Sequence, residues 1–322
     1  MLPVSKRAIA AILLAVLAAG LPLGGAFAQA EAELPPLPRP RPDRSATDAP
    51  TPATAGATAA TAAIDTATSA PQPVTLTAHI TRDGAPIPEG LVWRVFEATP
   101  DASGEVALVA KSEDGAAQFN LPPGHYLVHV AYGRAQASEE MAVQPGQNEV
   151  AIDLEAGALR LNSMVTGDIP ISPTQLHFDI FTAGSEASRL TVAENLPPNE
   201  IVTLNAGTYH IVSRFGDVNA AVRADLRIEP GELTDATLYQ RASELSFKLV
   251  SEAGGEAIAD VEWTVKTGDG ATVFSDRGAF PATVLAEGEY LVLAKLGDQV
   301  FNRQIEVQPG SPREIEVLTS VY

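Results

Sequence analysis

The chain has 322 residues, a formal net charge of −19 and no cysteine. An acidic surface without a basic patch repels nucleic acid and anionic membranes, so neither is expected as a partner. The missing cysteine excludes disulfides, thiolate metal sites, cysteine nucleophiles and a lipid-modified N-terminal cysteine. The length allows two or three domains.

Residues 1–28 have the three regions of a secretory signal peptide. Lys6-Arg7 precedes an apolar run over 8–21, and Ala26-Phe27-Ala28 forms a small-x-small cleavage site. An uncleaved membrane anchor is the alternative, but the apolar run is short for a spanning helix. Nothing later in the sequence is apolar for long enough to span a bilayer. We therefore expect export to a bacterial periplasm or cell surface, with a mature chain that begins at Gln29.

Residues 29–73 read as a disordered tether. A proline run over 34–42 favours polyproline II, and Ala, Thr and Pro repeats follow it. Such a segment has too few large apolar residues to offset its chain entropy. The alternative is a docking motif, in which Arg39, Arg41 and Arg44 on a stiff proline scaffold meet an acidic partner or a peptide-binding groove.

Residues 74–322 contain three copies of one unit, with a period of about 80 to 85 residues, which suits a small domain. Four landmarks recur in register. They are an upstream aromatic (Trp93, Phe178, Trp263), a Gly-x-Tyr (Tyr126, Tyr209, Tyr290), a later glycine (Gly133, Gly216, Gly297) and a Pro-Gly turn (145–146, 230–231, 309–310). The Pro-Gly pairs are typical of a turn before the last strand of each unit.

Alternation after each tyrosine predicts a strand with one buried and one partly wet face. Tyr126, Val128 and Val130 share the first face, while His129 lies on the other; Arg214 and Lys295 lie on this opposite face in the later copies. Each tyrosine is therefore expected to point into a core. This pattern is typical of an antiparallel sheet with one face against the core.

About seven short strands per unit, separated by turn signals, predict an all-β protein of three tandem antiparallel β-sandwich domains. The expected bounds are 74–156, 157–241 and 242–322, joined by short linkers at 155–158 and 240–244 that would make a stiff rod. Immunoglobulin-like and transthyretin-like topologies both remain open.

The Leu-x-x-Gly-x-Tyr-x-Val strand, its following glycine and the Pro-Gly turn resemble the carboxypeptidase-regulatory-like, prealbumin-type β-sandwich repeats of exported bacterial proteins. This resemblance covers most of 74–322 and implies a non-catalytic spacer, adhesion or binding module. One enzyme, the hydroxyisourate hydrolase, shares the transthyretin fold. Its C-terminal Tyr-Arg-Gly-Ser signature is absent here, since the chain ends Leu318-Thr319-Ser320-Val321-Tyr322.

No catalytic, cofactor-binding or metal site is predicted. Histidine occurs at five positions that are not equivalent in the repeats: His79, His125, His129, His177 and His210. His125 and His129 share a strand face but lie roughly 13 Å apart, too far to hold one ion without a third element. Glu139-Glu140 and Asp225 read as solvated carboxylates rather than an acid–base pair. Asp269 reads as a turn residue, because the ligand ladder of a calcium loop is missing.

The sequence therefore predicts an exported, non-enzymatic envelope protein whose modules bind or act as a scaffold for an unknown protein or glycan partner. A periplasmic carbohydrate-binding protein is one alternative, with Trp93 and Trp263 as sugar-stacking platforms rather than core residues. A hydrolase on a transthyretin-like fold is another. Sheet edges that receive a partner strand are a third possibility.

Overall fold

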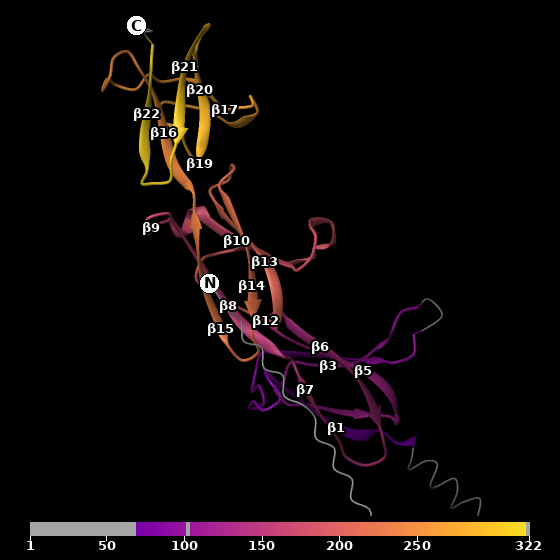
Figure 1. The fold of residues 1–322 in the computed structure, drawn as a ribbon. Coiled ribbons are helices and arrows are strands. Elements are labelled where there is room, and N and C mark those ends of the chain that lie inside the picture. Colours follow the sequence, from indigo (N-terminus) through magenta and orange to yellow (C-terminus); the bar gives the residue numbers. More distant parts are fainter. Residues whose placement is uncertain (1–68, 101–103, 320–322) are drawn as a thin grey trace, which may run out of the picture. The chain divides into compact units, whose positions relative to one another are not determined.

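The computed structural model describes residues 69–100 and 104–319 (Figure 1). The expected signal peptide, and the expected tether up to residue 68, lie outside the described residues. So does the docking motif that contains Arg39, Arg41 and Arg44. In the described part the chain is almost entirely β-structure, which confirms the all-β class of three tandem sandwiches.

Each sandwich begins and ends with a strand of the same sheet. The first is built from β1 (Gln72–His79), β2 (Leu91–Glu97), β3 (Leu108–Ser112), β4 (Ala117–Leu121), β5 (Gly124–Tyr132), β6 (Ala135–Val143) and β7 (Asn148–Asp153). The second is built from β8 (Ala156–Val165), β9 (Ile169–Pro170), η1 (Pro173–Gln175), β10 (Leu176–Thr182), η2 (Glu186–Ser188), β11 (Thr191–Leu196), β12 (Ile201–Asn205), β13 (Gly207–Phe215), β14 (Ala221–Ile228) and β15 (Leu233–Gln240). The third is built from β16 (Ala242–Val250), β17 (Glu262–Thr267), β18 (Thr272–Arg277), β19 (Ala282–Ala286), β20 (Gly288–Leu296), β21 (Gln299–Val307) and β22 (Arg313–Leu318).

The sheet order is the same in all three sandwiches. One sheet has the order β4-β1-β7, β12-β8-β15 or β19-β16-β22, with the short β9 added beside β8. The other has the order β3-β2-β5-β6, β11-β10-β13-β14 or β18-β17-β20-β21. In an immunoglobulin domain the first strand shares a sheet with the second, fourth and fifth strands. Here it pairs with the last strand in all three sandwiches, and its other long partner is β4, β12 or β19, so the immunoglobulin order is excluded.

In each sandwich, the sheet that contains the first and last strands is mixed rather than purely antiparallel, which corrects one expectation. β1 runs antiparallel to β4 but parallel to β7, and β8 and β16 are parallel to β15 and β22 in the same way. A strand's alternation reports which face is buried and carries no information on the direction of its neighbour. The sequence pattern could therefore place these strands in a sheet but could not orient them.

The joints between the sandwiches are shorter than the predicted linkers. Only Leu154 and Glu155 separate β7 from β8, and only Arg241 separates β15 from β16. The small residues Ala156 and Ala242, expected in linkers, are fully buried strand residues. β1 likewise begins at Gln72, inside the segment expected to be tether. Small side chains carry little hydrophobic signal, so the pattern underestimated how far these strands continue.

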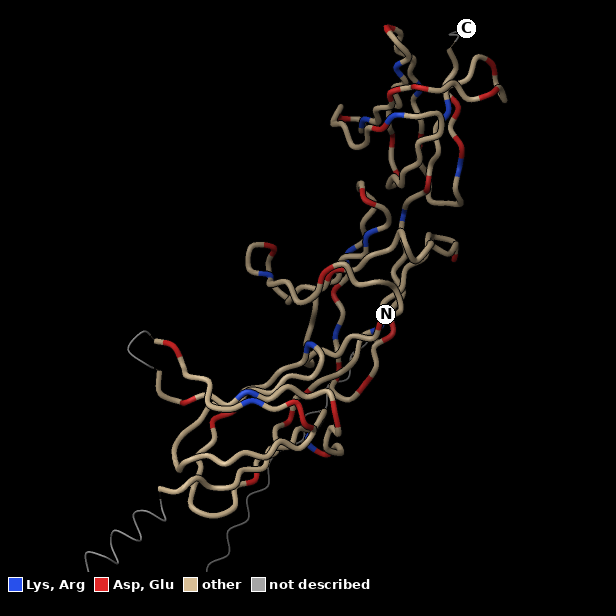
Figure 2. The backbone as a smooth tube through the Cα atoms, turned by 180° about the vertical axis from the view of Figure 1, so that it is seen from behind, with Lys and Arg blue, Asp and Glu red and all other residues tan. Residues whose placement is uncertain are grey.

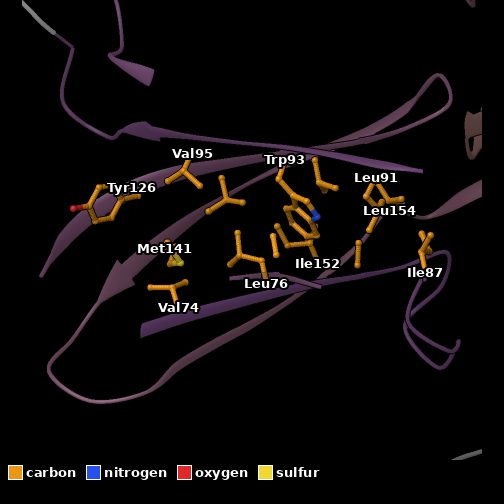
Figure 3. Close-up of a cluster of buried hydrophobic side chains, with 14 of the residues drawn as sticks. Val74, Leu76, Ile87, Leu91, Trp93, Val95, Tyr126, Met141, Ile152 and Leu154 are labelled. Carbon is orange, nitrogen blue, oxygen red and sulfur yellow. The ribbon is translucent and has the colours of Figure 1, made fainter. Parts of the chain in front are cut away.

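Apolar side chains from both sheets fill each core. In the first sandwich the indole of Trp93 lies among Leu76, Val95 and Ile152, between the two layers (Figure 3). Trp93, Phe178 and Trp263 are 0%, 0% and 1% exposed, so the equivalent upstream aromatics fill equivalent core positions. Burying one such ring is worth about 2 to 3 kcal/mol relative to leaving it in water.

Each repeat tyrosine donates a hydrogen bond to the carbonyl four residues before it. Tyr126 Oη donates to Pro122 O, Tyr209 Oη to Asn205 O and Tyr290 Oη to Ala286 O, all at 2.9 Å. Tyr126 and Tyr290 are buried and Tyr209 is half-buried. The prediction that these rings point inward is therefore confirmed, and the hydroxyl fixes the turn before the strand to the strand itself.

Asparagine side chains hydrogen-bond across both joints. Asn205 Nδ2 donates to Gln136 O at 3.0 Å and to Leu154 O at 2.8 Å, while Asn205 Oδ1 accepts from Gln136 N at 3.0 Å. Asn219 Nδ2 donates to Tyr290 Oη at 2.8 Å, and its Oδ1 accepts from Ala286 N at 2.9 Å. One side-chain amide thus satisfies backbone groups at each joint, as a neighbouring strand would do.

The turn glycine that follows the second repeat strand is required by both its backbone and its surroundings. Gly216 has φ of +68°, which favours glycine. A Cβ at this position would lie 2.8 Å from Val284 Cβ of the third sandwich. Any larger residue would therefore push the two chain segments apart, whereas the equivalent Gly297 has open space around it in the described part.

We expect Tyr290→Phe to lower the free energy of unfolding of the third sandwich by about 0.5–1.5 kcal/mol, because the Ala286 carbonyl and the Asn219 amide both lose a partner. Urea denaturation followed by circular dichroism measures it, because this signal reports all three sandwiches. Tyr239→Phe in the second sandwich is the control, since this hydroxyl bonds an exposed carboxylate, Asp168, and its loss should change stability less. Equal losses in the two variants would contradict the structural role of the repeat tyrosine.

Candidate functional site

The outer faces of the four-stranded sheets, defined as the faces turned away from the cores, carry the polar groups that could act on or bind another molecule. Acidic and basic residues occur in all three sandwiches (Figure 2). On β5, β13 and β20 the outward positions include His129, Arg214 and Lys295, as the alternation predicted. What differs between the sandwiches is the charge that the neighbouring strand places close to each of these residues.

The second sandwich buries a carboxylate on its outer face. Asp179 of β10 is 2% exposed although its neighbours Phe178 and Ile180 point to the core. Its Oδ1 accepts a hydrogen bond from Asn195 N at 3.0 Å, and its Oδ2 forms an ion pair with Arg214. Oδ2 has no well-directed hydrogen bond in the described part, so this contact is mainly one of charge.

A shallow hollow of about 380 Å³ adjoins this ion pair. Arg214, Arg223, His177 and Asn195 are among its lining residues, together with the acidic Asp217. Arg223 of β14 forms no ion pair in the residues that the structure describes. The hollow is therefore polar and of mixed charge, and Asp179 holds one of its arginines in place.

His210 and Asp225 form a second pair on the same face. His210 Nδ1 lies 2.7 Å from Asp225 Oδ1, and the imidazole is largely buried while the carboxylate is exposed. The two residues lie opposite each other on β13 and β14, and Phe181 is the neighbour of His210 on β10. A histidine held by a carboxylate could orient as a general base, but Phe181 offers it no nucleophile. Asp225, expected on an edge or loop, is in the edge strand β14.

The first sandwich places a row of three basic residues across its outer face. Lys111 of β3 is opposite Arg94 of β2, Arg94 is opposite His129 of β5, and His129 is opposite Ser138 of β6. His129 Nδ1 lies 3.0 Å from Ser138 Oγ. Burial lowers the pKa of His129, and the charge of Arg94 lowers this pKa further.

This His–Ser contact lacks the third member of a hydrolytic triad. In such triads a carboxylate orients the imidazole and stabilises its protonated form. Here the residue opposite His129 is Arg94, whose charge disfavours the protonated form. The arrangement therefore works against general-base catalysis at neutral pH rather than for it.

The third sandwich neutralises the outer lysine of its central strand β20 with an acid on the neighbouring strand. Lys295 Nζ lies 3.0 Å from Glu262 Oε2, and the two residues are opposite each other on β20 and β17. The side-chain hydrogen bond from Lys295 is the main cause that lowers the pKa of Glu262. Both side chains are half-exposed, so solvent screening leaves this pair a small role in stability.

The two tryptophans are buried and therefore cannot act as sugar-stacking platforms. The indole Nε1 of Trp93 donates to Asp114 O at 3.0 Å, and that of Trp263 donates to Gly278 O at 2.9 Å. Trp263 also stacks on Phe247, with ring centroids 5.7 Å apart. A sugar-binding aromatic needs a ring face open to solvent, and neither of these has one.

The remaining candidates occupy exposed strand or turn positions. Glu139 and Glu140 are exposed on the edge strand β6, as expected of a solvated face. Asp269 accepts a hydrogen bond from Thr267 Oγ1 in the turn between β17 and β18, which confirms the turn prediction. His125 is exposed near the start of β5, four residues before His129. Within the described ranges, no three His, Asp or Glu side chains gather closely enough to hold a metal ion.

Sequence reasoning missed two buried polar groups. Asp179 was passed over because a charged residue between two core residues of a strand is ordinarily solvated. Alternation along β13 puts Ser213 on the core face, where its partners come from strands distant in sequence: Ser163 Oγ at 2.8 Å, and Gln240 Nε2 at 2.9 Å from Ser213 Oγ. A hydroxyl on an otherwise apolar face was the available signal, since buried polar groups need hydrogen-bond partners.

Comparison with protein families found a match over the third sandwich. A family model described as a Rhizobiales growth-associated tandem repeat domain matches residues 244–319, which lie in the third sandwich. With the repeated fold, this match supports a bacterial β-rich repeat protein, and not the carboxypeptidase-regulatory-like family in particular. A comparison with curated proteins found no match. Among the described residues, no helix is both long and apolar enough to cross a membrane.

Solved structures with likeness to this chain include three from Gram-positive bacteria. The TIE protein of Bacillus anthracis is 17% identical over 78% of this chain and 50% of its own, with a TM-score of 0.23. The minor pilin GBS52 of Streptococcus agalactiae is 13% identical over 52% of this chain and 95% of its own, at 0.32. The major pilin subunit BcpA of Bacillus cereus is 11% identical over 77% of this chain and 99% of its own, at 0.22. This chain thus spans half the length of the TIE protein, and likeness at these scores carries no functional argument.

We expect Arg214→Gln to lower the free energy of unfolding by about 3–5 kcal/mol, because it leaves the buried Asp179 carboxylate without its counter-charge. Asp179→Asn should cost less, on the order of 1 kcal/mol, since the half-exposed guanidinium of Arg214 can be solvated. Thermal or urea denaturation of the two single variants measures the difference. A larger loss for Asp179→Asn would show that the pair is not held by the buried acid.

His129 should titrate below the ordinary histidine pKa of about 6.5. The folded protein then binds the His129 proton less readily than the unfolded chain, so this residue makes stability rise with pH and fall as pH drops below about 6.5. Proton NMR titration of the imidazole measures the pKa. Arg94→Gln should raise the pKa of His129 only part of the way toward the ordinary value, because burial is the larger cause of the lowered pKa. Arg223→Gln, on another sandwich, should leave this pKa unchanged. An ordinary or raised pKa in the unmodified protein would refute this account.

Proposed function

We propose that the chain is an exported, non-enzymatic protein of the bacterial envelope, whose three β-sandwiches act as a scaffold and as binding modules. The observation that carries the proposal is the division between faces. The cores repeat from module to module, whereas the outer faces carry different side chains at equivalent positions, such as Arg94, Asp179 and Thr264, each of which follows the core aromatic of its repeat. Similar cores with different outer faces support a protein that presents several binding surfaces rather than one that builds a single active site.

The joints support the scaffold part of the proposal. Linkers of one or two residues, together with the Asn205 and Asn219 hydrogen bonds, restrain each sandwich against the next. A flexible tether between modules would instead let them sample many separations. Restraint at the joints is what a protein needs if it holds binding surfaces in a defined order.

The chemistry of the described residues gives less support to a hydrolase. The His129–Ser138 contact has Arg94 where a triad has a carboxylate, and His210–Asp225 has Phe181 where a nucleophile would be needed. The carbohydrate-binding alternative loses both of its proposed platforms, Trp93 and Trp263, to the cores. A protein partner at the envelope is therefore the better-supported ligand class.

Cell fractionation of the source bacterium tests the proposal. We expect the chain in the periplasmic or surface fraction with Gln29 as its N-terminal residue, because residues 1–28 read as a signal peptide. A variant without residues 1–28 should stay in the cytoplasm and serves as the control. Recovery of the unmodified chain in the cytoplasm would overturn the export part of the proposal.

The role of the N-terminal segment is tested separately, by pull-down from intact cells with the mature chain and with a variant that lacks residues 29–73. If this segment is a spacer, both baits should recover the same partners. Loss of a partner with the shorter bait would assign docking to the segment instead.

A further inference from the structure

The edge strand β3 of the first sandwich is open to pairing. It ends the order β3-β2-β5-β6 and, among the residues that the structure describes, pairs only with β2. An edge strand presents unpaired backbone N–H and C=O groups. Exposed apolar side chains gather on the same short stretch: Val106 is 38% exposed, Leu108 is 52% exposed and Val109 is 40% exposed. An apolar, exposed edge of this kind is a template for one more strand.

Next to this edge, two cations face each other without an acid between them. Lys111 and Arg94 are directly opposite on β3 and β2, and like charges in this position destabilise a sheet. Neither residue forms an ion pair with any other residue that the structure describes. In the other two sandwiches, Arg214 and Lys295 each pair with an acid on the neighbouring strand. Among the described residues, Arg94 and Lys111 of the first sandwich have no such acid.

A hollow of about 610 Å³ lies against the same two strands. Arg94, Lys111 and Leu108 line it, together with Glu113 and Asp114, which follow the C-terminal end of β3. Asp114 is engaged there, since its carboxylate accepts a hydrogen bond from Ser112 Oγ at 2.8 Å. The hollow is therefore mixed in charge: Arg94 of β2 and Lys111 of β3 lie beside Leu108, and the two acids lie at the end that follows β3.

We propose that the β3 edge binds an extended acidic peptide segment of another protein, which adds to the sheet as a further strand. An acidic residue of this segment lies opposite Lys111 and within reach of Arg94, and an apolar residue lies opposite Leu108. Backbone hydrogen bonds to β3 supply affinity, and the two side-chain positions supply specificity. This assignment names the partner class for the binding role proposed above and rests on that role.

The test uses the full chain and a fluorescently labelled decapeptide of alternating valine and glutamate, with binding followed by fluorescence anisotropy. We expect saturable binding that weakens with salt, and binding at least about tenfold weaker for the matching valine–lysine peptide. The Arg94→Glu/Lys111→Glu double variant should lose the acidic peptide by a similar factor. Arg94→Gln/Lys111→Gln serves as the second variant if charge reversal disturbs folding.

The matched control is Arg223→Glu/Lys266→Glu, which makes the same change in net charge on the other two sandwiches. It should leave the affinity within about twofold if the site is local. Two peptides N-methylated along opposite edges test strand pairing, because only the edge that faces β3 needs its N–H groups. One of the two should bind as the parent does and the other should not. Hydrogen exchange at residues 108–112 should slow when the parent peptide binds.

Three results would each overturn the proposal. They are equal binding of the acidic and basic peptides, equal binding of the two N-methylated peptides, and unchanged hydrogen exchange over 108–112. Slowed exchange at these residues on raising the concentration of the chain alone would also overturn it, since β3 would then pair with a second copy. These results are independent of fractionation. A chain found at the envelope that fails to bind the peptide keeps its proposed function and loses only this site.

Discussion

The hydrogen bond from each repeat tyrosine to the carbonyl four residues earlier is the constraint on which the rest of the fold depends. It occurs three times, at Tyr126, Tyr209 and Tyr290, always across a turn that leads into the central strand of the four-stranded sheet. The ring fixes which face of that strand is buried, and period-two alternation then fixes every later side chain on it. In the second and third sandwiches, the residues that accept this bond are Asn205 and Ala286. Each also forms a hydrogen bond across the joint to the preceding sandwich.

Much of this architecture could be predicted from the sequence because it depends on local sequence patterns. The tyrosines, the upstream aromatics and the alternation specify strands, faces and three domains. The parallel pairing of β1 with β7 could not be predicted, since it depends on strands about 75 residues apart and on no local signal. Asp179 and the partners of Ser213 were missed for the same reason: each is buried by residues distant in sequence, Arg214 and Gln240 among them.

The three sandwiches have similar cores but different outer faces. Physical chemistry explains why the outer face can change while the core stays the same. A core position such as that of Trp93, Phe178 and Trp263 tolerates little change in volume, because interiors are close-packed. An outward position on the same strand faces water, where a change of charge alters stability little unless the group is buried. Asp179 is the exception, and its burial is why the second sandwich depends on an ion pair that the third, with its half-exposed Lys295 and Glu262, does not need.

The parallel pairing of first and last strands has a mechanical consequence. The chain enters each sandwich at one end of this strand pair and leaves it at the other, so tension along the chain pulls the two strands past each other lengthwise. The hydrogen bonds between the two strands are then loaded together, in shear, and do not break one after another from one end. The ladder over 158–165 and 233–240 in the second sandwich is longer than that over 74–79 and 148–153 in the first. Ladder length alone would therefore make the middle sandwich the more resistant of these two to stretching.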